Sequence, residues 1–291
     1  MTDATHMLSR IRVYGSFVRF SHSVFALPFA LTGALLAARE HGITTHEVFW
    51  MIVAMVAARS AAMGFNRLVD AQFDAKNPRT AMREIPRGAI STSQAAVFVV
   101  LTSGVFIVAA AQLSLLCLVL SPVALAIVFW YSLAKRYTHW TQAFLGLALA
   151  VAPVGGWFAA GGRGGLEPWV LGLAVALWVG GFDVLYACQD LEFDREHGLR
   201  SIPVRVGVPR ALAISRAMHA GTIAAMCALA MITMLGAIYM AGVAVVATLL
   251  AYEQSLVSPT DLSQVKRAFD LNGYVGILYL VFTAAAIYLH Q

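Results

Sequence analysis

Residues 168–194 read PWVLGLAVALWVGGFDVLYACQDLEFD, and this stretch decides the fold. Its first part, 168–188, holds a single charged residue, Asp183. It is about 20 residues long, which is the length of helix that crosses the hydrocarbon core of a bilayer. The stretch then ends in two aspartates four residues apart, Asp190 and Asp194. We therefore expect a transmembrane helix that carries carboxylates where it leaves the membrane.

The same composition recurs along the whole chain. Of the 291 residues, 60% are hydrophobic and only 12% are charged, and the mean hydropathy is +0.75. A soluble domain has about a quarter charged residues. No linker or change in composition divides the sequence, so we expect one domain over 1–291, an all-α integral membrane bundle of about nine transmembrane helices. The expected spans are 18–38, 46–66, 94–112, 114–133, 142–161, 168–188, 210–232, 235–252 and 271–289.

The basic residues indicate how these helices are oriented. If the N-terminus starts in the cytoplasm, nearly all of the 20 lysine and arginine residues fall in segments that face the cytoplasm. The exceptions are Arg39 and Arg163 in outward-facing connections and Arg59 within a span. Such a bias sets the orientation of membrane proteins, and it explains the net charge of +5 without a nucleic-acid partner. We expect a bacterial-type inner or plasma membrane protein whose N-terminus and acidic segments face the cytoplasm.

The first acidic motif continues the second expected span. Residues 66–74 read NRLVDAQFD, and spacing of four residues puts Asn66, Asp70 and Asp74 on one face of a helix. Pro78 is expected to end this helix, because proline lacks a backbone N–H and its ring clashes with the preceding turn.

The second acidic motif continues the sixth expected span. Asp183, Asp190 and Asp194 lie at i, i+7 and i+11, which again predicts one face of a helix. Segments 64–80 and 184–200 form a weak internal repeat, because each runs from a membrane helix into a DxxxD pair and then into a basic turn.

Two carboxylate pairs at one membrane surface predict a metal site. Carboxylates four residues apart destabilise a helix unless a positive charge lies between them. Mg²⁺ prefers oxygen ligands and is commonly bound by one or two carboxylates together with substrate phosphates. Ordinary salt bridges at the membrane surface explain one such pair more readily than two. The basic residues beside the motifs are Arg79, Arg83, Arg87, Lys135, Arg136 and Arg200.

Those cations favour a diphosphate ligand, because a leaving diphosphate gains negative charge that positive groups stabilise. Two further charged residues, Arg59 and Asp183, lie inside expected spans. Charges at membrane depth are costly and are functional candidates by default.

At these motifs the sequence resembles the UbiA-type family of intramembrane aromatic prenyltransferases. Asn66, Asp70 and Asp74 match the NxxxDxxxD motif of that family, and Asp190 and Asp194 match its DxxxD motif. The second motif lies in YACQDLEFDREHGLRSIPVRVG, and YSLAKRYTHWTQAFLGLALAVAPVGGW also follows the family pattern. The chain is most similar to the branch of 4-hydroxybenzoate polyprenyltransferases.

One string departs from the family pattern. Many family members carry a basic residue followed by proline near the start of the first span. Here the string is Arg19-Phe-Ser-His22-Ser, a difference that concerns the acceptor more than the reaction.

The resemblance implies a bundle around a central cavity, with a polar mouth for a diphosphate and two Mg²⁺ ions. Under this hypothesis one ion is held by Asn66, Asp70 and Asp74, and the other by Asp190 and Asp194. Diphosphate binding is assigned to Arg79, Arg83, Lys135 and Arg200. The catalytic candidates are Asp183 for the ring proton, Tyr131 and Tyr186 for an allylic cation, and Lys135 and Arg59.

The expected reaction is Mg²⁺-dependent transfer of a polyprenyl group from its diphosphate to 4-hydroxybenzoate or a related hydroxy-aromatic carboxylate in quinone biosynthesis. The expected partners are polyprenyl diphosphate, that aromatic acceptor and membrane lipid. Related alternatives are a naphthoate-type enzyme of menaquinone biosynthesis and a haem or chlorophyll prenyltransferase. Alternatives of other classes are a transporter with intramembrane carboxylates, a lipid diphosphate phosphatase and an alcohol phosphotransferase.

Overall fold

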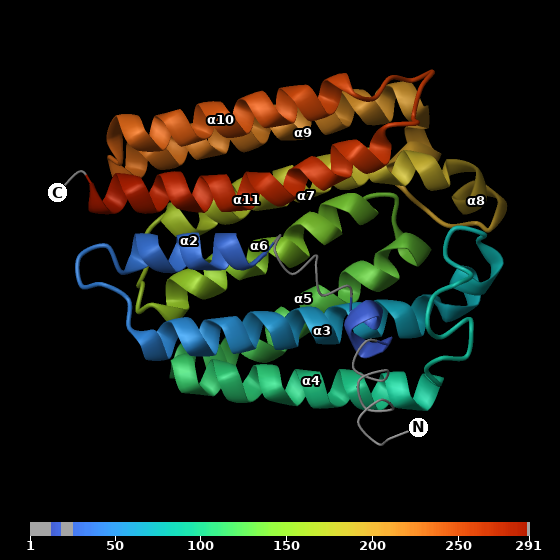
Figure 1. The fold of residues 1–291 in the computed structure, drawn as a ribbon, viewed down its shortest axis with the longest axis horizontal. Helices are drawn as coiled ribbons and strands as arrows, with labels where there is room; N and C mark the ends of the chain where they lie inside the picture. Colours follow the sequence, from blue (N-terminus) through green and yellow to red (C-terminus); the bar gives the residue numbers. More distant parts are fainter. Residues whose placement is uncertain (1–12, 19–25, 290–291) are drawn as a thin grey trace, which may run out of the picture.

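The chain is a bundle of long helices that lie side by side along one axis (Figure 1). The computed structural model describes residues 13–18 and 26–289. Arg19 and His22, which carry the departure from the family pattern, lie outside these residues. The helices of the described part are α2 (Leu27–Ala37), α3 (Thr45–Lys76), α4 (Thr92–Leu113), α5 (Leu115–Tyr137), α6 (Thr141–Ala159), α7 (Glu167–Ala187), α8 (Leu191–Glu196), α9 (Ile202–Thr233), α10 (Gly236–Ser255) and α11 (Val265–Tyr288).

The expectation of an all-α membrane bundle is confirmed. Within residues 13–18 and 26–289, eight helices are long and apolar enough to cross a membrane. The first expected span, 18–38, corresponds to α2, a shorter apolar helix of 11 residues. The part of that span at 19–25 lies outside the described residues.

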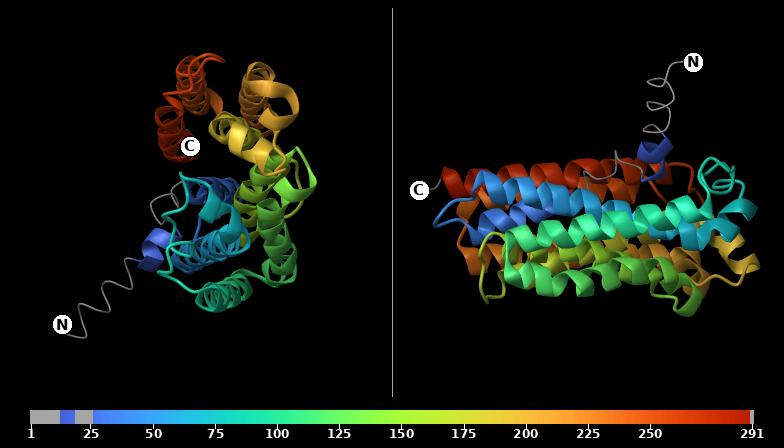
Figure 2. Two further views of the ribbon diagram at one scale, coloured as in Figure 1. Left: turned by 90° about the vertical axis from the view of Figure 1, so that its right-hand side faces the viewer. Right: turned by 90° about the horizontal axis from the view of Figure 1, so that it is seen from below.

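The two acidic motifs are delivered to the same end of the bundle. Helix α3 has 32 residues and runs without a break from the membrane span through the first motif to Lys76. It stops at Asn77, immediately before Pro78, as the sequence predicts. The loop after α3 and helix α8 lie together at this end (Figures 1 and 2). The antiparallel arrangement of α3 and its neighbours therefore brings together segments that are more than 100 residues apart in the sequence.

Local sequence signals fix where the connecting loops begin and end. Thr44 and Glu47 form a capping box at the start of α3, and Ser91 and Gln94 form one at the start of α4. These side chains satisfy backbone N–H groups that have no partner within the helix. Ser114 ends α4 and caps α5, so the two helices form a tight hairpin.

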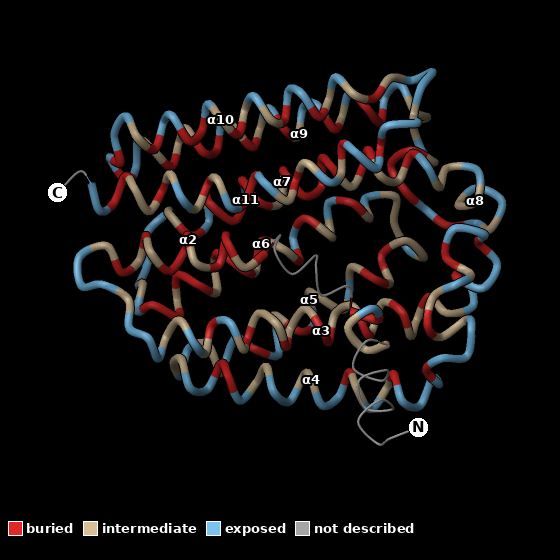
Figure 3. Tube along the Cα trace, in the orientation of Figure 1, coloured by how far each residue is buried: buried red, intermediate tan, exposed pale blue. Residues whose placement is uncertain are grey.

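The interior is packed through small residues and a few large aromatic side chains. Gly33 approaches the backbone of Pro153, and Gly156 approaches the backbone of Ala30, which lets α2 and α6 lie close together. Buried residues face the interior, whereas exposed residues follow the outer sides of helices such as α4 and α10 (Figure 3). Many of the exposed side chains are apolar, as expected for surfaces in contact with lipid.

Helix α7, which leads into the second motif, makes polar contacts with its neighbours. The Ser215 hydroxyl on α9 donates to the Gly181 carbonyl at 2.8 Å. The indole N–H of Trp178 donates to Asn272 on α11 at 2.6 Å. Because both contacts are buried, they fix the rotation of α7 more firmly than apolar packing alone would.

The close approach of α2 and α6 can be tested with adjacent glycines. A Cβ at Gly156 would lie 2.0 Å from the Ala30 carbonyl oxygen, whereas one at Gly155 would meet nothing within 4 Å. We expect Gly156→Ala to lower the free energy of unfolding by about 1–3 kcal/mol, the usual cost of overpacking. Gly155→Ala should not. Thermal unfolding of the two purified variants would measure this, and equal unfolding temperatures would contradict the packing.

Candidate active site

The first motif lies on one face of the C-terminal end of α3, as its spacing predicts. Asp70 and Asp74 are almost buried, at 2% and 6% exposure. The Asn66 amide donates to Asp70 Oδ2 at 3.2 Å, and all three side chains line the same pocket. Burial of carboxylates at this depth requires compensating partners.

The second motif is not on one continuous helix, which corrects the expected geometry. Helix α7 ends at Ala187 and is followed by a 3₁₀ turn over Cys188–Asp190 and then by α8. A 3₁₀ turn has about 3.0 residues per turn instead of 3.6, so it rotates the following residues relative to α7. Asp183, Asp190 and Asp194 nevertheless line the same cavity.

Each acidic motif is paired with cations from another segment. Arg83 Nη1 contacts both oxygens of Asp74, at 2.7 and 2.8 Å. Lys135 Nζ lies 2.8 Å from Asp70 Oδ2. Arg79, which follows the first motif, binds Asp190 of the second, with Nε 3.0 Å from Oδ1. This last ion pair joins the two motifs directly.

The position of Arg79 affects its protonation. Burial by itself would lower the pKa of Arg79. Electrostatic attraction to Asp190, and after it to Tyr186, acts in the opposite direction and is larger in total, so the pKa of Arg79 is raised above the ordinary value for arginine. Arg79 also donates to the Tyr186 hydroxyl at 2.9 Å, and its guanidinium lies 5.2 Å from the centre of that ring. Arg79 is therefore a fixed positive charge at the junction of the two motifs.

These groups surround a polar chamber of about 210 Å³. Its lining includes Asn66, Asp70, Asp74, Arg79, Arg83, Tyr131, Lys135, Asp183, Asp190 and Asp194. All five predicted metal ligands thus line one chamber, together with three of the four residues predicted to bind diphosphate.

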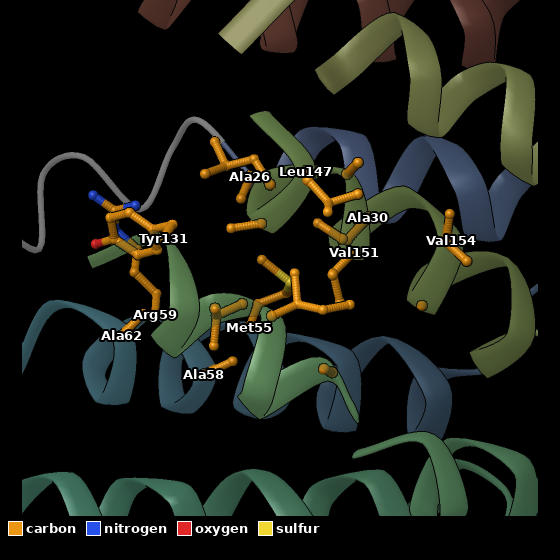
Figure 4. A pocket seen from close by; sticks show the side chains of 18 of the residues that line it. Ala26, Ala30, Met55, Ala58, Arg59, Ala62, Tyr131, Leu147, Val151 and Val154 are labelled. Atoms are coloured by element: carbon orange, nitrogen blue, oxygen red, sulfur yellow. The ribbon is translucent and has the colours of Figure 1, made fainter. Parts of the chain in front are cut away.

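The chamber adjoins a larger apolar cavity of about 760 Å³. Asn66, Arg83, Tyr131, Leu145 and Asp183 line both, so the two spaces are contiguous. Figure 4 shows the walls of the larger cavity, formed by side chains of α2, α3, α5 and α6 around an open centre.

Two of the predicted catalytic residues lie on the larger cavity alone. Arg59 is on α3, on the same side of the helix as Asn66 but further from the chamber, and its side chain extends toward Tyr131 (Figure 4). Tyr186 lines the cavity near Phe269, whose ring centre is 5.0 Å away. Phe269 comes from α11, and nothing in its sequence surroundings indicates a place at the site.

Arg200 is placed differently from the prediction. Among the described residues it lines neither space. Its guanidinium donates to the carbonyl of Tyr137, and its backbone N–H donates to the carbonyl of Lys135 at 2.8 Å. Arg200 ties the loop before α9 to the end of α5.

Arg136 contacts a carboxylate of the site, although the sequence indicated it only as one of the basic residues beside the motifs. Its Nη2 lies 3.0 Å from Asp70 Oδ1 and 2.7 Å from the Val69 carbonyl oxygen. Its position next to Lys135 is the one sequence signal that could have found it.

The donor set matches a hard divalent cation. Among the described residues, the candidate ligands that line the chamber are all oxygens, from carboxylates, amides and hydroxyls, with no histidine or cysteine, which is the chemistry that Mg²⁺ prefers. Over residues 13–18 and 26–289, no three carboxylate, histidine or cysteine side chains form a ready-made cage. Mg²⁺ rarely uses such cages and instead completes its shell with substrate phosphates and water.

The fold and the site define an integral membrane protein of the helical-bundle class, with a charged chamber at one end of an apolar cavity. The UbiA prenyltransferase family matches residues 26–284. A 4-hydroxybenzoate octaprenyltransferase from Vibrio parahaemolyticus is 31% identical over 256 residues, covering 85% of this chain and 87% of that one. The chain belongs to the UbiA prenyltransferase family and is a prenyltransferase.

Solved structures share the fold. A UbiA homolog from Aeropyrum pernix is 38% identical, with a TM-score of 0.83 over 93% of this chain and 98% of that one. A UbiA homolog from Archaeoglobus fulgidus, bound to GPP and Mg²⁺, has a TM-score of 0.71 at 17% identity, over 94% of this chain and 99% of that one.

The different placements of Arg79 and Arg200 predict different effects of substitution. We expect Arg79→Gln to raise KM for a prenyl diphosphate at least about tenfold, because a hydrogen bond to a charged group contributes about 1.5–3 kcal/mol. Arg200→Gln should leave KM close to that of the wild type. Steady-state kinetics of diphosphate release would measure both. A larger effect at Arg200 than at Arg79 would contradict the geometry.

Proposed function

We propose that this protein transfers a polyprenyl group from a polyprenyl diphosphate to 4-hydroxybenzoate or a related hydroxy-aromatic carboxylate, in a reaction that depends on Mg²⁺. The observation that carries the proposal is the junction of a charged chamber with an apolar cavity several times larger. A prenyl diphosphate has the same division into a charged head and an apolar tail. The name of the Vibrio parahaemolyticus relative and the GPP and Mg²⁺ bound to the Archaeoglobus fulgidus homolog support it.

The chamber residues would hold the head of the donor. Asn66, Asp70 and Asp74 on one side, and Asp190 and Asp194 on the other, are the residues that would hold two Mg²⁺ ions. When bound, Mg²⁺ acts as a Lewis acid that neutralises the diphosphate and improves it as a leaving group. Three cations of this chain line the chamber and would bind the remaining phosphate oxygens; they are Arg79, Arg83 and Lys135.

The apolar cavity would hold the tail and exclude water from the reacting carbon. When the C–O bond breaks, its electron pair leaves with the diphosphate and an allylic cation remains. An aromatic ring face stabilises a nearby cation. Arg79 already lies over the ring of Tyr186, so Tyr131, which lines both spaces, is the better candidate.

The acceptor would bind between the chamber and the deeper cavity. Arg59 places a positive charge on the cavity wall, where it would pair with the carboxylate of the acceptor. A ring carbon of the acceptor would then bond to the allylic carbon, and Asp183, at the junction of the two spaces, would take the ring proton. Arg59 would act in acceptor binding and Asp183 in proton transfer.

The positive-inside bias supports a chamber that opens to the cytoplasm. The basic residues of the loop after α3 and of the end of α5 lie at the chamber end of the bundle, and such residues are retained on the cytoplasmic side. The proposed location is a bacterial-type inner or plasma membrane, with the N-terminus on the cytoplasmic side.

The position of the carboxylates disfavours a transporter. Transporters place their ion sites near the bilayer midplane on broken helices, whereas here the acidic motifs lie together at one end of the bundle, within cation pairs. A naphthoate acceptor remains the alternative within the family, because its carboxylate could bind Arg59 equally well.

The metal assignment predicts which aspartates are essential. We expect Asp70→Asn and Asp190→Asn each to lower kcat at least about 100-fold, since metal assistance contributes several kcal/mol. Asp270→Asn is a matched control, because the Asp270 side chain is 60% exposed and pairs with Lys266 on its own helix. Product formation from labelled prenyl diphosphate and 4-hydroxybenzoate would be measured at saturating Mg²⁺, with unchanged gel-filtration profiles as evidence of folding.

Either aspartate variant with turnover near that of the wild type would show that the assigned ligands are wrong. Diphosphate release without any acceptor would point instead to hydrolysis. Release that depends on the acceptor, with a prenylated ring found by mass spectrometry, would support transfer.

The proposed role of Arg59 concerns the acceptor alone. We expect Arg59→Gln to raise KM for 4-hydroxybenzoate at least about tenfold through loss of a charge-assisted hydrogen bond, while KM for the donor stays unchanged. A panel containing 4-hydroxybenzoate, a dihydroxynaphthoate and uncarboxylated phenol would also identify the acceptor class. If the variant loses equal affinity for phenol, Arg59 does not bind the carboxylate.

A further inference from the structure

Among the buried carboxylates of the site, Asp70 has an unusual set of contacts. Arg83 contacts both oxygens of Asp74, and Arg79 contacts both oxygens of Asp190. Asp70 instead divides its oxygens between different partners. Oδ2 lies 2.8 Å from Lys135 Nζ and accepts from the Asn66 amide at 3.2 Å.

The other oxygen, Oδ1, faces a residue outside the chamber. It lies 3.0 Å from Arg136 Nη2. Lys135 and Asn66 line the chamber, whereas Arg136 is absent from its lining as far as the described residues show. Consecutive helical residues project about 100° apart, which is why adjacent positions on α5 can face the chamber and the flank of α3.

Arg136 is also fixed by contacts that do not involve the carboxylate. Nη2 donates to the Val69 carbonyl at 2.7 Å, and the guanidinium lies 5.5 Å from the centre of the Phe73 ring. Nη1 donates to the Ser132 carbonyl, one turn earlier on α5, at 3.4 Å. A planar guanidinium can make these contacts together, whereas a lysine ammonium acts as a single point charge.

We infer that Arg136 is a positioning residue for Asp70: it tethers the end of α5 to α3 and holds the carboxylate so that Oδ2 points into the chamber. This inference rests on the proposed function, in which Asp70 is a metal ligand. Lys135 and Arg136 then have separate roles, because Lys135 faces the diphosphate and Arg136 acts only through Asp70.

Two effects of removing Arg136 have opposite signs. Loss of a positive charge near the metal would strengthen metal binding, whereas loss of orientation would weaken it. Arg136 contacts Oδ1 and does not line the chamber among the described residues, whereas Lys135 contacts Oδ2 and does, so the charge of Arg136 would be the more distant one from a metal in the chamber. Partners that orient a metal ligand typically change metal affinity by about 10–100-fold. Orientation is therefore expected to dominate.

The test measures metal binding without substrate. Mn²⁺ would be titrated into purified protein in lipid nanodiscs and followed by electron paramagnetic resonance. We expect Arg136→Gln to raise the Kd for Mn²⁺ about 10–100-fold, with KM for prenyl diphosphate unchanged at saturating Mg²⁺. Lys135→Gln should instead raise KM for prenyl diphosphate and change the Kd for Mn²⁺ less. Arg267→Gln, at an arginine that contacts Tyr252 on an exposed surface, is the control and should change neither.

Two further variants separate positioning from a general loss of structure. Arg136→Lys keeps the charge but lacks the planar guanidinium that spans Asp70, Val69 and Ser132, so it should recover only part of the affinity for Mn²⁺. If Arg136→Gln does not purify as a folded protein, this variant carries the test. In an Asp70→Asn background, Arg136→Gln should weaken Mn²⁺ binding no further, because residues that act through one another are non-additive.

Unchanged or tighter Mn²⁺ binding in Arg136→Gln would overturn the inference, provided that Asp70→Asn still weakens binding. If Asp70→Asn itself leaves Mn²⁺ binding unchanged, the metal assignment of the proposed function fails instead.

Discussion

The structure of the site depends on the pairing of buried carboxylates with cations at the membrane surface. An ionised carboxylate removed from water is costly unless it is paired and hydrogen-bonded. Asp70 and Asp74 are nearly buried, and each has a cation within 3 Å. Because these cations come from α5 and from the loop after α3, the pairing also fixes how those segments sit on α3.

The two acidic motifs reach the site by different routes. The first lies on a continuation of α3, whereas the second begins in the 3₁₀ turn at the end of α7, with Asp190, and continues into α8, with Asp194. That turn breaks the regular helix but keeps Asp190 in reach of Arg79, across 111 residues of sequence. Ser215 and Asn272 make buried polar contacts with the part of α7 that precedes the turn. The irregular half of the site is thus supported by α9 and α11, which contribute little else to the chamber.

Much of this could be predicted from the sequence, for identifiable reasons. Hydrophobic length predicted the membrane helices, and four-residue spacing predicted that Asn66, Asp70 and Asp74 share a face. The direction of side chains in loops could not be predicted. Arg200 follows the second motif closely and was expected to bind diphosphate, yet its guanidinium donates to the Tyr137 carbonyl. Phe269 reaches the cavity only because α11 packs beside α7. Contacts of that kind depend on tertiary packing, which no local pattern contains.

The charges that orient the chain and those that line the chamber are partly the same residues. Arg79, Arg83 and Lys135 belong to the basic segments on which the proposed orientation rests, and all three line the chamber. Under the proposed function, the orientation of the protein and the side from which the charged head group enters would therefore be linked. The apolar cavity beyond Arg59 can accept only the other end of an amphipathic molecule, because it offers little polar compensation. Under the proposed function, one distribution of charge would thus set the topology of the chain, the end at which the chamber forms and the direction in which the substrate lies.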